Sequence, residues 1–269
     1  MALSLHQLTA LDASPRELIH IARRLGVSSV CLFTHVPEAG AGRYPLVGKG
    51  DVGDLRAVLD EAGITLSNIE VFSLDRTRPR DDLDPGLALG AALGATRATA
   101  HLHEVSSHDE AVDRFAEFAT RAAAHGIVAG LEFNNFSAVR DVASAERIVR
   151  SAGQGSLVLD MLHAVRGAAT TSDVARAADL IDYAQLCDGP ADMPDDGRWR
   201  EAVGERLPPG DGGFPLIQLV RPLRAEVVFD IEVPQSSARK AGVPAFDRAR
   251  RAVDASRRLL AKLDEERAL

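Results

Sequence analysis

The sequence predicts an α/β protein built as a single (β/α)8 TIM barrel that spans residues 1–269 as one domain. Short apolar runs alternate with helical patterns along the chain, which is typical of a parallel sheet covered by helices. Eight such repeats fit a length of 269 residues, because a barrel of this kind needs about 250. An open, doubly wound sheet is the alternative, but no GxGxxG turn follows the first strand, so nothing favours a dinucleotide-binding fold.

The first half of the chain contains four strand–helix repeats. A strand over 3–8 leads to a helix over 14–25, which begins at Ser14-Pro15 because proline suits the first helical turn, and which Gly26 ends. A strand over 29–33 and a loop with glycine and proline precede a helix over 51–62. The expected elements that follow are a strand over 64–74, a helix over 85–93, a strand over 95–101 and a long amphipathic helix over 107–125.

The second half repeats the pattern with shorter helices. The expected elements are a strand that ends at Glu132, a helix over 144–152, a strand over 156–160, a helix over 172–178 and a strand over 181–186. A long loop rich in proline and glycine, 188–213, precedes a short helix over 214–219, a strand over 227–231 and a charged amphipathic helix over 245–266. No linker or low-complexity tract interrupts the series, so we expect no second domain.

Composition narrows the class of protein. Hydrophobic residues make up 46% and aromatic residues 4%, which suits a core of aliphatic parallel strands. A net charge of -8 argues against nucleic acid as the main partner. Cys31 and Cys187 lie in apolar runs and are expected to be reduced thiols. Without a signal pattern or an apolar run of membrane-spanning length, the expectation is a cytoplasmic protein that does not contact a membrane.

Oxygen-bearing side chains stand at the ends of the last four strands, namely Glu132, Asp160, Gln185 and Glu232. In a barrel these strand ends converge on one pocket, where three carboxylates repel unless a cation lies between them. An all-oxygen donor set favours a divalent metal such as magnesium or manganese over a structural zinc. The acids exceed a divalent charge by one, which a protonated His163 or a loop arginine such as Arg198 could offset.

Sequence motifs from 130 to 233 resemble the xylose isomerase-like TIM-barrel superfamily. They read LEF, LDMLH, YAQLCDG, PPGDGG and FDIEVP, and they place Glu132, Asp160 with His163, Gln185 with Asp188, and Glu232 in the family order. The superfamily includes sugar isomerases and epimerases, inosose and dehydroshikimate dehydratases, and endonuclease IV. PPGDGG is similar to the PGxG loop that usually lies between the last two ligands. Gln185 stands where many epimerases have histidine and is similar to some dehydratases, which weakens a plain epimerase interpretation.

The resemblance implies proton transfer next to a carbonyl of a sugar or sugar-like polyhydroxy substrate. A divalent metal would act as a Lewis acid, and Glu132 and Glu232 would flank the substrate as bases. If the abstracted proton is returned to the substrate, the result is isomerisation or epimerisation, which is the favoured activity. Loss of a β-hydroxyl, helped by an acid such as His163 or His103, gives the alternative, a lyase of the dehydroshikimate- or inosose-dehydratase type or a β-eliminating deglycosidase.

The expected partner is therefore a small carbohydrate-like molecule, held by His103, Asn134, His163 and Arg198. Asn134 lies two residues beyond Glu132 and so points the same way if the strand continues. Endonuclease IV needs a zinc cluster rich in histidines, which Gln185 and the net charge disfavour. A non-catalytic binding or structural barrel is the remaining alternative, although it has no need for three clustered acids. Apolar faces on the first and last helices could support a homo-oligomer.

Overall fold

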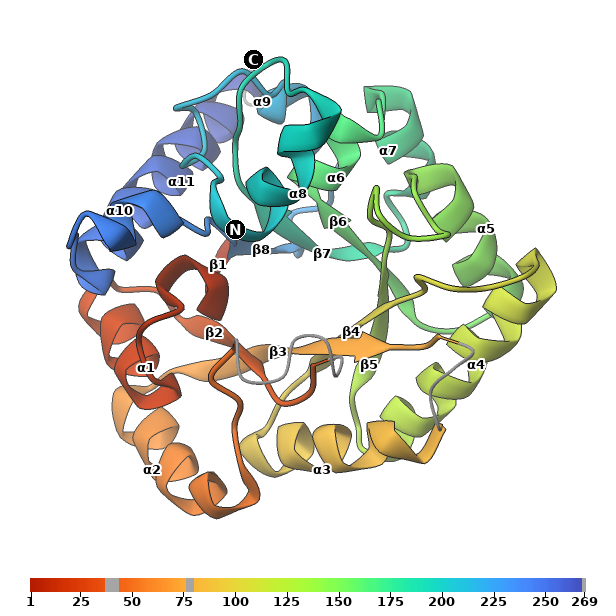
Figure 1. Ribbon diagram of the computed structural model, residues 1–269, viewed down its shortest axis with the longest axis horizontal. Helices are drawn as coiled ribbons and strands as arrows, with labels where there is room; N and C mark the ends of the chain where they lie inside the picture. Colours follow the sequence, from red (N-terminus) through yellow and green to blue (C-terminus); the bar gives the residue numbers. More distant parts are fainter. Residues whose placement is uncertain (37–43, 76–79, 268–269) are drawn as a thin grey trace.

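The protein forms a closed barrel of eight parallel strands. The structure is a computed structural model that describes residues 1–36, 44–75 and 80–267. Each strand pairs with the next along the chain, and β8 returns to β1 to close the ring. Figure 1 shows the strands enclosed by a ring of helices. The (β/α)8 barrel predicted from the sequence is therefore confirmed.

The strands agree with the predicted runs to within about two residues at each end. They are Ala2–His6 (β1), Ser29–Phe33 (β2), Thr65–Ser73 (β3), Arg97–His101 (β4), Val128–Glu132 (β5), Ser156–Asp160 (β6), Ile181–Leu186 (β7) and Val228–Ile231 (β8). Every pairing is parallel, so all eight carboxyl ends lie on one face of the barrel.

The helices that cover the barrel are Pro15–Arg24 (α1), Val52–Ala62 (α2), Asp84–Leu93 (α3), His108–Ala124 (α4), Val142–Ala152 (α5), Met161–Arg166 (α6), Thr171–Ala177 (α7), Asp195–Gly204 (α8), Leu216–Val220 (α9), Ser236–Lys240 (α10) and Ala245–Arg267 (α11). Short 3-10 turns cover Gln7–Ala10 (η1), Lys49–Asp51 (η3) and Arg80–Leu83 (η4). No described helix is both long and apolar enough to cross a membrane.

Local sequence signals set the ends of several helices. Ser14 caps α1 in a reciprocal capping box with Glu17, in which each side chain bonds the other residue's backbone N–H. Helices α2 and α3 end at Gly63 and Gly94, whose φ angles of 65° and 82° lie in the left-handed region that glycine adopts without strain. The glycine directly after each of these helices therefore ends it at the boundary that the sequence predicts.

Three short helices were not predicted. Helices α6 and α10 span six and five residues, too few to give a clear apolar period. Helix α8 lies inside the segment 188–213 that was predicted to be a loop, so that prediction is wrong for ten of its residues. Pro194 precedes α8, and Asp195 and Asp196 in its first turn stabilise the positive end of the helix dipole. The difference matters, because α8 carries residues of the candidate site.

The interior of the barrel is polar, whereas branched aliphatic side chains usually fill such barrels. Ser4 of β1 reaches across to Ser67 of β3, with their hydroxyl oxygens 2.8 Å apart. The Asn68 amide donates to the Thr99 hydroxyl at 2.9 Å. Asp230 of β8 is fully buried in the same region. The apolar core lies instead between the strands and the helices, so the polar interior leads directly to the face where the strands end. Cys31 and Cys187 are buried free thiols, as predicted.

Candidate active site

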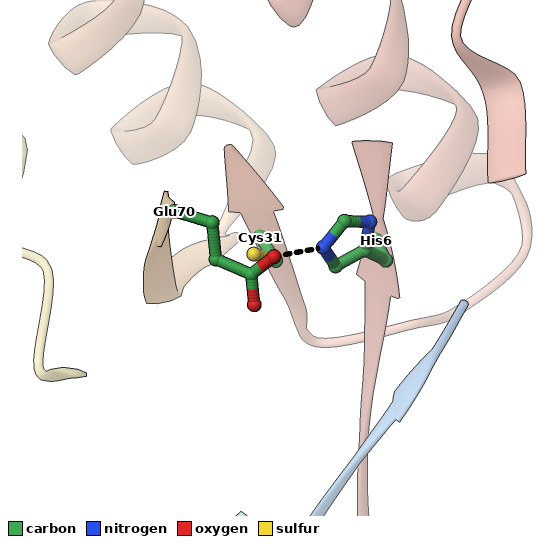
Figure 2. Close-up of side chains that lie close together, drawn as sticks. All are labelled: His6, Cys31 and Glu70. Atoms are coloured by element: carbon green, nitrogen blue, oxygen red, sulfur yellow. Dashed lines mark hydrogen bonds and ion pairs between the residues drawn. The ribbon is translucent and has the colours of Figure 1, made fainter. Parts of the chain in front are cut away.

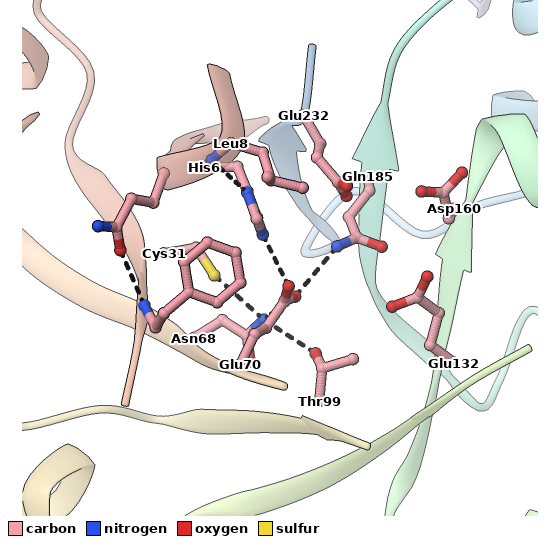
Figure 3. Close-up of polar contacts among 12 residues, drawn as sticks. His6, Leu8, Cys31, Asn68, Glu70, Thr99, Glu132, Asp160, Gln185 and Glu232 are labelled. Carbon is pink, nitrogen blue, oxygen red and sulfur yellow. Dashed lines mark hydrogen bonds and ion pairs between the residues drawn. The ribbon is translucent and has the colours of Figure 1, made fainter. Parts of the chain in front are cut away.

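The four predicted oxygen donors meet at the carboxyl end of the barrel. Glu132, Asp160 and Gln185 end or nearly end β5, β6 and β7, and Glu232 follows β8 directly. Their exposed fractions are 4%, 0%, 1% and 4%, respectively. Asp160 and Gln185 are register partners on neighbouring strands. Figure 3 shows all four side chains facing one space above the barrel interior.

A buried arginine that was not predicted lies among these acids. The Arg206 guanidinium donates to Asp160 Oδ2 at 2.6 Å and pairs with Glu232 Oε1 at 3.1 Å, with 3% of the side chain exposed. Burial alone would raise the pKa of Asp160, but Arg206 and His163 together outweigh burial and hold that pKa below its usual value. Arg206 therefore offsets the excess negative charge of the acids, a role expected from the sequence for His163 or Arg198.

Asp188 fixes the loop that delivers Arg206. Its Oδ1 accepts hydrogen bonds from the backbone N–H groups of Gly189 and Phe214 at 2.8 and 3.0 Å. Its Oδ2 accepts those of Gly210 and Gly212 at 2.8 and 3.1 Å. The PPGDGG segment thus folds around one buried carboxylate. A carboxylate satisfied by four N–H groups is a structural anchor, and it is not free to bind a metal.

Glu132 lies between two histidine rings. Its Oε2 lies 2.9 Å from His101 Nε2, and its Oε1 lies 4.0 Å from His163 Nε2. Burial, followed by repulsion from Asp160, raises the pKa of Glu132 well above its usual value. Burial also raises the pKa of Glu232, even though Arg206 opposes the rise. Both carboxyls are therefore poised to hold a proton or to gain from a cation.

His163 is neutral in this environment. Asn135 Nδ2 donates to the His163 carbonyl at 3.3 Å, which leaves Asn135 Oδ1, 3.3 Å from His163 Nδ1, as an acceptor. Nδ1 therefore carries the ring proton, and Nε2 presents a lone pair toward Glu132. Burial lowers the His163 pKa to about 3. The structure thus contradicts the expectation that a protonated His163 offsets the acids.

The other predicted substrate contacts divide into two groups. His103 and Asn134 line a cavity of about 480 Å3 together with Glu132 and His163. Burial lowers the His103 pKa to about 4, so this ring is also neutral near pH 7. Arg198 instead pairs with Asp195 at 3.1 Å on α8, and it does not line this cavity. The structure does not bring Arg198 to the acids.

Gln185 is held by a buried network that the sequence did not reveal. Its Nε2 donates to Glu70 Oε1 at 3.0 Å, across the barrel from β7 to β3. Glu70 also accepts a bond from Asn68 at 2.8 Å and lies 2.7 Å from His6 Nε2 (Figure 2). Figure 3 shows the Gln185 amide oxygen turned away from Glu70, toward Asp160 and Glu132. The network therefore points an oxygen donor at the acids.

Within the described part of the chain, two groups of side chains have the spacing of metal ligands. One comprises Glu132, Asp160 and His163, and the other His6, Cys31 and Glu70, with donor atoms within 4.8 Å of one another in each. In the second group the Leu8 backbone N–H donates to His6 Nδ1 at 2.9 Å, so the ring proton sits on Nε2. That proton meets Glu70, as Figure 2 shows, and the second group forms a hydrogen-bonded cluster instead of a cation site.

The first group, taken together with Gln185 and Glu232, fits a divalent cation. Gln185 Oε1 and Glu232 Oε2 are buried acceptors with no hydrogen-bond partner among the described residues. Buried acceptors without partners are costly, and a cation would satisfy both. When ionised, Glu132, Asp160 and Glu232 outnumber the one guanidinium of Arg206, so the site then carries net negative charge. The donors are buried, they offer free oxygen lone pairs and they carry negative charge, as in the oxygen-rich sites that bind hard divalent ions.

Many solved structures resemble this fold, and they include the following three. A xylose isomerase-like TIM barrel/4-hydroxyphenylpyruvate dioxygenase fusion protein has a TM-score of 0.81 and 18% identity over 99% of this chain, which spans 44% of that protein. The IOLI protein with a binding zinc atom has a TM-score of 0.77 and 18% identity, over 98% of this chain and 99% of its own. An L-ribulose 3-epimerase has a TM-score of 0.74 and 16% identity, and the match covers 100% of this chain and 97% of the epimerase.

A search of curated proteins by sequence finds no match. The similarity to solved structures shows a shared fold, because the identities are below one fifth in each case. The family model described as xylose isomerase-like TIM barrel matches residues 19–262, nearly the whole chain. It includes all four strand-end donors and the loop that carries Arg206. The chain therefore belongs to the xylose isomerase-like TIM barrel family.

Proposed function

We propose that the protein is a divalent-metal-dependent isomerase or epimerase that removes a proton next to a carbonyl of a sugar-like polyhydroxy substrate. The observation that carries the proposal is the set of buried oxygen donors at four adjacent strand ends, in which Gln185 Oε1 and Glu232 Oε2 have no hydrogen-bond partner among the described residues. Glu132, Asp160, Gln185 and Glu232 would hold the metal, and His163 Nε2 lies within reach of the same space. The metal, when bound, supplies Lewis-acid polarisation of the substrate carbonyl.

Glu132 is the stronger candidate for the base. It lines the cavity, whereas Glu232 is engaged by Arg206. Burial raises the pKa of the Glu132 carboxyl, and a carboxyl with a raised pKa holds an abstracted proton better than an ordinary glutamate does. His101 Nε2, 2.9 Å away, fixes the carboxylate in place, so the proton would pass from the substrate carbon to an oriented oxygen of Glu132.

The relatives support the proposal in two respects. The solved epimerase acts on a ketose, and the zinc-bound relative shows that a barrel of this fold holds a divalent metal. The donor set of this chain is richer in oxygen than a typical zinc site, so magnesium or manganese is the better match to its chemistry. A carbohydrate-like small molecule is the substrate class that this site would bind.

A lyase is the second candidate, because the two glutamates are not equivalent. Epimerisation through two bases needs a free carboxylate on each face of the substrate, yet Arg206 pairs with Glu232 and leaves only Glu132 open to the cavity. A single base is enough for elimination. Gln185 also favours a lyase, because the glutamine at this ligand position is similar to that of some dehydratases of the superfamily. The lyase would be of the dehydroshikimate- or inosose-dehydratase type, or a β-eliminating deglycosidase.

Proton exchange in D2O tests the proposal. The protein would be loaded with Mg²⁺ or Zn²⁺, which do not broaden NMR signals, and mixed with ketoses, inososes, dehydroshikimate and oxidised glycosides. We expect deuterium at the carbon next to the carbonyl, lost on chelation and in Glu132→Gln but kept in Glu61→Gln, a change on the exposed face of α2. An enone product or a released aglycone identifies the lyase. No exchange on any compound, with the fold intact, overturns both candidates.

A further inference from the structure

A row of aromatic rings leads from the candidate base to the solvent. The ring centroids of His163 and Phe136 are 6.1 Å apart, and those of Phe136 and Trp199 are 5.1 Å apart. His163 is the ring nearest to Glu132 in this row. The exposed fraction rises from 6% at His163 to 37% at Phe136 and 57% at Trp199. All three rings line the 480 Å3 cavity, so they mark one wall from its floor to its mouth.

Helix α8 presents the outer part of this wall. Trp199, Ala202 and Val203 follow the spacing that places side chains on one face of a helix, and all three line the cavity. The helix is held from below by Glu201, which is 1% exposed and pairs with Arg166 at 2.5 and 2.9 Å. A buried bidentate ion pair therefore fixes the position of Trp199, although most of its own ring is open to water.

The cavity has two chemically different zones. Its polar zone is lined by Glu70, Glu132 and Arg206, whereas Phe33 and Tyr44, with centroids 4.9 Å apart, and the side chains of Leu8 and Val36 add to the apolar lining. A volume of about 480 Å3 lies within the range of about 300–1,000 Å3 that drug-sized ligands occupy. A single sugar ring at the acids would leave the aromatic wall uncovered, and exposed aromatic clusters of this kind mark binding surfaces.

We propose that the substrate carries a flat apolar group, of the aryl class, on its polyhydroxy carbonyl part, and that Phe136 and Trp199 bind this group. The inference rests on the proposed function for the position of the carbonyl part, which would lie beside Glu132 and Asp160. The substituent then extends along the row of rings toward solvent. Aromatic rings bind each other through offset or edge contacts, which the perpendicular Phe136–Trp199 pair can offer on either side.

The single tryptophan makes the test direct. Trp199 is the only tryptophan of the chain, so tryptophan fluorescence, excited selectively over that of the two tyrosines, reports on the mouth of the cavity. The Mg²⁺-loaded protein would be titrated with methyl, phenyl and glucosyl 3-oxo-β-D-glucosides, which share one hydroxyketone part and differ in the substituent. We expect a saturable change in Trp199 emission with the phenyl compound, and binding about tenfold tighter than for the methyl compound.

Variants of Trp199 and Phe136 test whether these two rings cause the preference for the phenyl compound. In Trp199→Ala and Phe136→Leu, studied by calorimetry, the phenyl-to-methyl affinity ratio should fall to about one. Val243→Ala is the control, because Val243 is exposed to 38%, much as Val203 is to 36%, but does not line the cavity. Equal affinity for phenyl and methyl compounds in the parent protein, or tighter binding of the glucosyl compound, overturns the inference. Phenyl preference without any deuterium exchange would instead overturn the proposed function and leave the aryl site standing.

Discussion

Gln185 Nε2 donates to Glu70 Oε1 at 3.0 Å, and this bond decides which end of the Gln185 amide faces the acids. An amide can present either its oxygen or its nitrogen, and only the oxygen binds a cation. Glu70 offers only acceptors, and it also receives bonds from His6 and Asn68. The nitrogen of Gln185 is therefore committed to Glu70, and the oxygen is left for the metal. Partners of this kind commonly tune metal affinity as strongly as some ligands do.

Glu70→Gln should weaken metal binding by about 10–100-fold without unfolding the protein. The new amide can donate to Gln185 and so permits the orientation that turns the Gln185 nitrogen toward the acids. Calorimetric titration with Mn²⁺ measures the affinity. Glu146→Gln is the matched control, because Glu146 is a buried carboxylate paired with Arg150 and Arg176 on the outside of the barrel. Equal metal affinity in the two variants would show that Glu70 has no positioning role.

Arg206→Met should lower the stability of the metal-free protein by about 3–5 kcal/mol, because it leaves Asp160 and Glu232 buried without their cation. Metal should restore more stability in the variant than in the parent, since it replaces the missing positive charge. Thermal unfolding with and without Mn²⁺ gives both differences. A metal-induced gain that is the same in the two proteins would mean that Arg206 and the metal do not share these carboxylates.

The sequence reveals the fold and the acids because both depend on short-range patterns. Apolar strands ending in Glu132, Asp160 or Glu232 are visible in any window of a few residues, and the barrel closes in chain order. Arg206 is not visible in this way, because its position depends on a loop folded around Asp188. Asn68 and Glu70 are two residues apart, a spacing that places both side chains on one face of a regular strand. The pairing of β3 with its neighbours shifts register, however, so the regular alternation of its side chains between the two faces is not a safe guide.

Helix α8 shows the same limit for secondary structure. Its segment is rich in proline and glycine, so local composition predicts a loop. Tertiary contacts override that preference, since Glu201 is buried against Arg166 and fixes the helix on the barrel. Arg198 was expected at the acids because it lies in the right connection. The helical turn instead directs it to Asp195, and Trp199 lines the cavity.

Metal affinity should rise with pH, and metal binding should release protons. Burial raises the pKa values of Glu132 and Glu232 in the metal-free protein, so each carboxyl keeps its proton to higher pH than an ordinary glutamate does. A cation must displace those protons, and the affinity therefore increases as pH rises through the raised values and levels off above them. Titrations in buffers of different ionisation enthalpy count the released protons. A pH-independent affinity with no proton release would contradict the raised pKa values.

Asp188→Asn should destabilise the loop that holds Arg206, and the substitution is informative because it changes one atom. Whichever oxygen position the new amide nitrogen takes, it meets two backbone N–H donors that were bonded to a carboxylate oxygen. Buried donors left unsatisfied cost about 1–3 kcal/mol, so we expect an unfolding free energy lower by about that amount.

Arg206 would then be held less firmly against Asp160, and protease cleavage between Leu207 and Phe214 should become faster. Asp211→Asn is the control within the same loop, since among the described residues the Asp211 side chain forms only an ion pair with the exposed Arg251. Such surface pairs contribute about 0–1 kcal/mol. If the two variants unfold at the same denaturant concentration and are cleaved at the same rate, Asp188 is not the anchor of this loop, and the position of Arg206 must depend on its own contacts with Asp160 and Glu232.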